Sequence, residues 1–366
     1  MLYEMNEIGS EFWLGCTPSS SKEYSMRPYN IYHSDLFNVV ETLSGRTALE
    51  YIVEFLKAQG KRIAYLPSYC CHTMIEPFIS HGMEVKFYDV AYTPYGLHRL
   101  VRNDEVYDAI LLMDYFGKVD KETLELASFA RQNRKIVIYD ATHSMYSDVE
   151  YSHYDFIYGS YRKWVNINCG FLAWKKGGKS VDFTQVGSNE HYVDLRKKLF
   201  DIKAKYIDGE LTNKQSFLPL IIESENVLEK EYHHCMPDDW SNEVLRTTDA
   251  EYLKNRRRAN AQILMSALQD IADCRIRCVN AILGLNDIPL FVPVMINESH
   301  RDGLRCYLIS QDIYCPVHWP LTAQHDEMTG SNQLFASELS LICDQRYDNI
   351  DMMRIADCIR EYWNKN

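Results

Sequence analysis

The sequence has no apolar run that approaches the roughly 20 residues a helix needs to cross a bilayer. Its first 16 residues lack a basic region followed by an apolar stretch, so we do not expect a secretory signal peptide. Basic residues are also outnumbered: 39 Lys and Arg against 51 Asp and Glu give a net charge of −12, whereas nucleic-acid binders usually carry a basic face. These absences predict a cytoplasmic protein whose partners include neither a membrane nor a nucleic acid.

Cysteine pairs of the Cys-x-x-Cys type are absent, although the chain contains eleven cysteines. Cys70 and Cys71 are adjacent, and several others stand singly in apolar stretches, as buried thiols do in a reducing compartment. We therefore expect neither a disulfide framework nor a zinc site, and no other metal site is predicted.

Two common phosphate-binding motifs, Gly-x-Gly-x-x-Gly and the P-loop, are missing as well. Instead, Ser44-Gly45-Arg46-Thr47 leads directly into apolar residues at helical spacing, which predicts a helix beginning at Gly45. Unpaired amides and the positive end of the helix dipole make such a terminus an anion-binding site. An ordinary helix cap is the alternative interpretation.

What the sequence does contain is an alternation of buried strands and helices through its first half. This order is typical of a parallel sheet covered by helices on both faces. At 366 residues the chain is long enough for more than one domain. We predict an α/β fold with an N-terminal arm (1–30), a large α/β domain (31–245) and a small C-terminal α+β domain (246–366).

Two of the predicted strands end in polar residues. One leads into Asp140, with His143 three residues on, and the next leads to Ser160, with Lys163 three residues on. Because ligands bind at the carboxyl ends of strands in open α/β sheets, these side chains should meet. An acid, a hydroxyl and a lysine amine are what an enzyme that uses pyridoxal phosphate (PLP) requires. Ordinary alternatives are a cap or metal ligand for Asp140, a core histidine for His143 and a surface residue for Lys163.

Beyond these positions, the chain resembles the DegT/StrS-like aminotransferases, a family of fold-type I PLP enzymes that act on keto-sugar nucleotides. The matching segments follow the family's order across most of the chain. They are Ser44-Gly45-Arg46-Thr47-Ala48-Leu49, Leu66-Pro67-Ser68-Tyr69, Phe116-Gly117, Tyr139-Asp140-Ala141-Thr142-His143, Ser160-Tyr161 with Lys163, Arg257-Arg258-Ala259-Asn260-Ala261 and His318-Trp319-Pro320.

The resemblance implies roles for several of the matching residues. Lys163 would form the Schiff base with PLP, Asp140 would pair with the pyridine nitrogen, and His143 would lie near the ring hydroxyl. The phosphate would be held by Gly45, Arg46, Thr47 and Ser160.

Two assignments are open for the residue that stacks on the PLP ring. In the sugar aminotransferases an aromatic residue serves four positions after the proline, and Cys71 holds that position here. In other fold-type I enzymes the aromatic residue follows Pro-Ser directly, with a His three residues later, and Tyr69 and His72 match that arrangement. We predict Tyr69 as the stacking residue and His72 as a supporting residue behind the acid.

The chain departs from the family in ways that concern the substrate. The interval from Ser160 to Lys163 is shorter than in sugar aminotransferases, and the Gly-Glu-Gly-Gly run expected after the lysine is absent. Arg346 would suit a carboxylate clamp because a guanidinium group binds carboxylates bidentately, with a surface salt bridge as the alternative. His318 and Trp319 are predicted to face the substrate.

The resemblance implies an aminotransferase that forms a homodimer with shared active sites. Glutamate or glutamine would donate the amino group, and a keto acceptor, expected to be a keto-sugar nucleotide, would receive it. One alternative is another PLP reaction on an amino acid, such as decarboxylation or carbon–carbon cleavage. A catalytically silent PLP-fold binding protein is the other.

Overall fold

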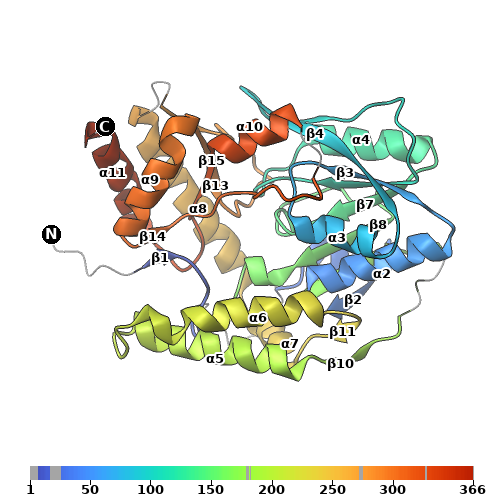
Figure 1. Ribbon diagram of the computed structural model, residues 1–366, viewed down its shortest axis with the longest axis horizontal. Helices are drawn as coiled ribbons and strands as arrows, with labels where there is room; N and C mark the ends of the chain where they lie inside the picture. Colours follow the sequence, from blue (N-terminus) through green and yellow to red (C-terminus); the bar gives the residue numbers. More distant parts are fainter. Residues whose placement is uncertain are drawn as a thin grey trace.

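The computed structural model describes residues 7–16, 26–178, 181, 183–271, 275–325 and 328–365 (Figure 1). At its centre lies an eight-stranded sheet with the order β2-β9-β8-β7-β6-β3-β4-β5. The strands are β2 (Phe37–Thr42), β3 (Ile63–Pro67), β4 (Glu84–Thr93), β5 (Gly96–Leu100), β6 (Ala109–Met113), β7 (Ile136–Asp140), β8 (Phe156–Ser160) and β9 (Gly170–Lys175).

Strands β3, β4, β6, β7 and β8 run parallel to one another, which confirms the predicted, mostly parallel sheet. β5 and β9 are antiparallel to the strands beside them, so the sheet is mixed. β6 and β8 are buried at every residue, as central strands covered on both faces must be. This apolar core holds the carboxyl ends of the central strands in fixed positions.

Helices α2 (Gly45–Ala58) and α4 (Lys121–Gln132) lie against the sheet. α2 begins at the predicted residue because the Ser44 hydroxyl accepts a hydrogen bond from the Thr47 amide at 3.1 Å. α2 packs on β8 and β9, whereas α4 packs on β5, β6 and β7. The shorter helices of this part are α1 (Tyr29–Tyr32) and α3 (His72–Ser80).

The C-terminal part has a smaller antiparallel sheet and a separate apolar core, as the predicted α+β organisation requires. Figure 1 shows α8, α9 and α11 gathered beside this second sheet. The elements are α8 (Ala250–Leu268), β12 (Ile276–Cys278), β13 (Val292–Ile296), α9 (Glu298–Ser310), α10 (Thr329–Ser337), β15 (Glu338–Leu341) and α11 (Asn349–Lys365).

Arg257 on α8 ties this part to the main sheet. Its guanidinium group lies over the Trp164 ring, 4.5 Å from the centroid, and donates to Gln345 Oε1 at 2.8 Å. Gln345 in turn donates to the Trp164 carbonyl at 2.7 Å. These contacts fix the segment that directly follows Lys163.

The described N-terminal residues, 7–16, lie on the body of the same chain. β1 (Ile8–Gly9) pairs with β14 (Ile313–Tyr314), and the buried Lys203 amine lies 2.9 Å from Glu7 Oε1. Residues 1–6 and 17–25 of the predicted arm lie outside the described residues.

The remaining elements form a helical layer at the bottom of Figure 1, where α5 and α6 pack against each other. Within the described residues, no helix combines the length and apolar character that a membrane crossing would need. The elements of this layer are β10 (Val186–Ser188), α5 (Glu190–Ile207), α6 (Leu218–Lys230), β11 (Cys235–Met236) and α7 (Asp239–Thr247).

Candidate active site

A cavity of about 350 Å³ lies at the carboxyl ends of β7 and β8. Asp140 is the last residue of β7 and Ser160 the last residue of β8, and these neighbouring parallel strands deliver both to the same place. A 3-10 turn, Tyr161–Lys163, then brings Lys163 to the cavity wall. The structure therefore brings these three predicted residues together.

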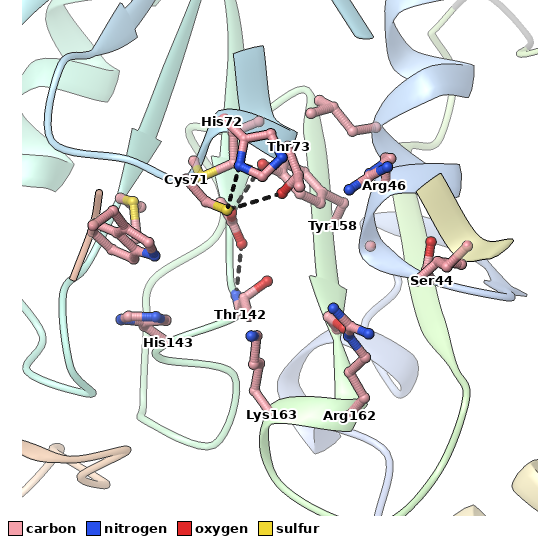
Figure 2. A pocket seen from close by; sticks show the side chains of 18 of the residues that line it. Ser44, Arg46, Cys71, His72, Thr73, Thr142, His143, Tyr158, Arg162 and Lys163 are labelled. Atoms are coloured by element: carbon pink, nitrogen blue, oxygen red, sulfur yellow. Dashed lines mark hydrogen bonds between the residues drawn. The ribbon is translucent and has the colours of Figure 1, made fainter. Parts of the chain in front are cut away.

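Lys163 points into the cavity, with His143 on one side and Arg162 on the other (Figure 2). The wholly buried Trp164 anchors its turn by donating its indole N–H to the Thr142 carbonyl at 2.8 Å. The Lys163 side chain is exposed to the open space of the cavity, and protein groups surround its amine. Desolvation, followed by the Arg162 cation, lowers the pKa of Lys163 below its ordinary value. A neutral amine is the form that attacks a carbonyl carbon or accepts a proton.

Asp140 is buried, and each of its oxygens accepts a hydrogen bond. The Thr142 amide donates to Oδ1 at 2.8 Å, and the Tyr158 hydroxyl donates to Oδ2 at 2.9 Å. Burial raises the pKa of Asp140, while these hydrogen bonds and the Lys163 charge oppose the rise. Because a buried carboxylate is most stable beside a cation, Asp140 is suited to hold a positively charged ring nitrogen.

His143 is buried and lies on the side of Lys163 that is opposite Arg162 (Figure 2). The Phe116 amide donates to its Nδ1 at 3.2 Å, which leaves the ring proton on Nε2. Burial, followed by the Lys163 charge, lowers the pKa of His143 to about 3, so the ring is neutral near pH 7. The Trp319 ring lies 5.2 Å from the His143 ring between centroids, and both residues line the cavity.

The N-terminus of α2 forms the end of the cavity farther from His143 (Figure 2). The first-turn amides of Gly45 and Arg46 find no acceptor among the described residues. Gly170 permits this arrangement because a Cβ there would lie 2.4 Å from the Ser44 carbonyl carbon. Thr47 does not line the cavity, and its hydroxyl donates to a backbone carbonyl. This end therefore offers N–H donors and a helix dipole to an anion.

Cys71 lines the cavity, whereas Tyr69 does not. Tyr69 is fully buried, with its ring 5.0 Å from that of Trp319. The Cys71 sulfur accepts a hydrogen bond from the Thr73 hydroxyl at 3.2 Å and lies 3.9 Å from His72 Nδ1. Burial opposes ionisation of this thiol, but the interactions with His72 and Thr73 outweigh burial and lower the pKa of Cys71 to about 7. His72 lines the cavity as well.

A second cavity, of about 490 Å³, adjoins the first. Arg162, Lys163 and Glu225 line both cavities, so the lysine stands between them. Of the predicted substrate residues, Trp319 lines the first cavity, whereas His318 and Arg346 line the second.

Arg346 is fully engaged with the protein. Its Nε and Nη2 donate to the Asp344 carboxylate at 2.9 and 2.7 Å, and its Nη1 donates to the Glu11 carbonyl at 3.0 Å. His318 is partly engaged, since its Nδ1 lies 2.9 Å from the Ser340 hydroxyl. Arg346, the predicted carboxylate clamp, therefore lies at the second cavity, and each of its three guanidinium nitrogens already donates a hydrogen bond to the protein.

Three residues that shape these cavities were not predicted. Tyr158 could have been found, because it precedes Ser160 by two residues and so lies on the same face of β8. Glu225 and Arg196 carried no such signal, since only the packing of α5 and α6 brings them to the lysine.

The described residues contain one group of possible metal ligands away from these cavities: Glu50, Glu54 and His81. The two carboxylates already pair with neighbouring histidines, Glu50 with His233 and Glu54 with His234. The expected absence of a metal stays a prediction.

No family model and no curated protein matches the sequence. Solved structures do match it. PseC of Helicobacter pylori, an aminotransferase involved in the biosynthesis of pseudoaminic acid, has 11% identity and a TM-score of 0.65 over 98% of this chain and 100% of its own. DesI, determined in the presence of its TDP-sugar product, has 13% identity and a TM-score of 0.61 over 97% and 94%. NtdA of Bacillus subtilis, with bound cofactor PMP, has 13% identity and a TM-score of 0.57 over 88% and 73%.

The chain has the fold of the DegT/StrS-like sugar aminotransferases. PseC and DesI cover nearly all of this chain, so the shared fold includes both the large sheet and the C-terminal α+β part. The predicted fold class is therefore confirmed. Identities of 11–13% show the fold alone, and the function depends on the residues that line the two cavities.

Proposed function

We propose that this protein is a PLP-dependent aminotransferase. The observation that carries the proposal is that Lys163, the buried Asp140 and the free amides of the α2 N-terminus line a single cavity. These are an amine, a carboxylate and an anion site, the three groups that PLP needs from a protein. The match to NtdA, which holds PMP on the same fold, supports this assignment.

The residues of the first cavity fit this cofactor. The unpaired amides of Gly45 and Arg46, with the Ser160 hydroxyl, would hold its phosphate, and Asp140 would hold its ring nitrogen. Glycine at position 45 leaves room for the phosphate beside Ser160, because a Cβ at this position would lie 3.2 Å from the Ser160 Cβ. When bound, PLP supplies an electron sink for the negative charge that develops on the substrate carbon.

The protein's own groups would handle the protons. Lys163 Nζ, with its lowered pKa, would take a proton from the carbon that bears the donor's amine. In the half-reaction with the acceptor it would give a proton to the carbon that receives the amine. His143 stays neutral and can donate a hydrogen bond from Nε2, while Asp140 would supply the negative charge that pairs with the ring nitrogen. Trp319 and the other apolar side chains of the lining would limit the access of water to these groups when the cavity is occupied.

The proposal extends to the substrates. Glutamate or glutamine would donate the amine, and a keto-sugar nucleotide would accept it. Support for a sugar acceptor comes from PseC and from the TDP-sugar product of DesI, which share the fold. A cytoplasmic homodimer with active sites shared between subunits completes the proposal.

Borohydride trapping tests the central claim. The purified protein is incubated with PLP, reduced with borohydride, digested and examined by mass spectrometry. We expect a phosphopyridoxyl group on the peptide that contains Lys163, and its absence in Lys163→Ala. Lys176→Ala, an exposed lysine in the turn after β9, is the matched control and should be labelled like the wild type. A wild-type protein that gains no label would overturn the proposal.

Amine transfer is then followed with [15N]glutamate and candidate keto acceptors. Production of 2-oxoglutarate with label in the acceptor supports a transaminase. Loss of CO2 or cleavage of the donor's carbon chain would instead establish one of the alternative PLP reactions.

A further inference from the structure

Arg196 on α5 is a buried cation with incomplete hydrogen bonding at the wall of the second cavity. Its side chain is only 3% exposed. One face of the guanidinium group packs on the Phe200 ring, 4.7 Å from the centroid, and Nη2 donates to Glu11 Oε2 at 2.9 Å. Nε and Nη1 are buried and have no hydrogen-bond partner among the described residues.

Such unpaired donors are uncommon in folded proteins, because a buried N–H group without an acceptor loses its hydration without compensation. The guanidinium group cannot relieve this by losing a proton. Because Arg196 lines the cavity, a molecule bound there can supply the missing acceptor, and an anion suits a cation best.

The charges around the second cavity favour the same conclusion. Five arginines line it, against the carboxylates of Glu11, Glu225 and Asp344. Glu225 pairs with Arg162 and Asp344 pairs with Arg346, while Arg305 has no acidic partner among the described residues. The remaining wall is largely apolar, so the surplus positive charge is the feature that would select a ligand.

We propose that Arg196 binds a carboxylate of the amino-acid donor, or of its keto-acid product, in the second cavity. This inference rests on the proposed function, because the donor must reach Lys163, which lines the same cavity. The singly charged carboxylate fits better than a diphosphate, since three carboxylates already border the space. Arg346, the residue that sequence analysis favoured for this role, has each of its nitrogens engaged by the protein.

Binding of glutarate to the PLP-treated protein, measured by calorimetry, tests this assignment. Glutarate carries the two carboxylates of the donor but has no amine or keto group, so its binding does not depend on chemistry at Lys163. We expect Arg196→Gln to weaken glutarate binding about 10- to 100-fold, the value of one or two charge-assisted hydrogen bonds. Arg277→Gln, which removes an exposed arginine of β12, should bind glutarate like the wild type.

A second variant protects the test against misfolding. Arg196→Gln alone leaves Glu11 without its partner, whereas the double change Glu11→Gln with Arg196→Gln removes both charges, so that no unpaired carboxylate remains. The double variant should unfold like the wild type and still bind glutarate weakly. Neutral glutaramide, which offers no carboxylate, should bind weakly to every variant.

Unchanged glutarate affinity in both variants would overturn the assignment. A loss of affinity for thymidine diphosphate without a loss for glutarate would also overturn it and would place the acceptor's phosphates at Arg196 instead. The borohydride label at Lys163 is measured in the same preparations, so that failure of this assignment can be told from failure of the proposed function. If Lys163 is labelled but the variants bind glutarate normally, only the role of Arg196 is refuted. If Lys163 is not labelled, the proposed function is refuted.

Discussion

Arg162 and Glu225 form a bidentate ion pair beside Lys163, with Nη1–Oε1 and Nη2–Oε2 distances of 2.5 and 3.1 Å. The Arg162 cation lowers the pKa of Lys163, and the Glu225 anion opposes that effect. Desolvation is the larger cause of the lowered pKa, and the pair adjusts the pH at which the lysine becomes neutral.

Arg162→Gln should move PLP labelling of Lys163 to higher pH. The change removes a cation and leaves the Glu225 anion unbalanced, and both effects raise the pKa of Lys163. Glu225→Gln should move the profile in the opposite direction. The measurement is the rate of borohydride-trapped label across a pH series, and two profiles identical to the wild type would contradict the prediction.

Asp140→Asn should slow amine transfer by at least about 100-fold, because the negative charge opposite the ring nitrogen is lost. Label at Lys163 should still form, which separates this effect from misfolding. Tyr158→Phe removes only one hydrogen bond to Asp140, so a milder loss of roughly tenfold is expected. Steady-state rates with glutamate measure both, and an Asp140→Asn variant as fast as Tyr158→Phe would refute the role of the carboxylate.

Cys71 should react with N-ethylmaleimide with a midpoint near pH 7, since His72 and Thr73 lower the pKa of its thiol to about 7. Bound PLP should slow this reaction, because Cys71 lines the first cavity. Mass spectrometry of the Cys71 peptide gives the rate. Cys306, an exposed cysteine on α9, serves as the control and should be modified equally with and without PLP. If Cys71 is modified at the same rate with and without PLP, the cofactor does not bind in the first cavity.

Gly170→Ala should destabilise the protein by about 1–3 kcal/mol, the usual range for overpacking. Its Cβ would lie 2.5 Å from the Gly45 amide nitrogen, so the N-terminus of α2 must move and PLP binding should weaken. Urea unfolding and PLP titration test the two effects. Gly187→Ala is the control, since a Cβ there meets nothing within 4 Å. Equal stability and affinity in the two variants would argue against the anion site.

The convergence of Asp140, His143 and Lys163 could be predicted because it depends on short-range order. Adjacent parallel strands deliver their carboxyl ends to one edge of the sheet, and short segments carry the residues that follow. The path after β3 was harder to predict. Cys71 is the N-cap residue of α3 and lines the cavity, whereas Tyr69, two residues earlier, is buried in the core beneath it.

Local features of the sequence were enough to predict the α/β class, the helix that begins at Gly45 and the strand ends that carry Asp140 and Ser160. Hydrophobic periodicity, capping residues and short intervals are local properties, so they can be read without the fold. Which arginine keeps unpaired donors at the second cavity could not be predicted in this way, because it depends on contacts between distant segments. Glu11, Arg196 and Arg346 come from distant parts of the chain, and their pairing depends on the packing of the N-terminal residues between α5 and the C-terminal part.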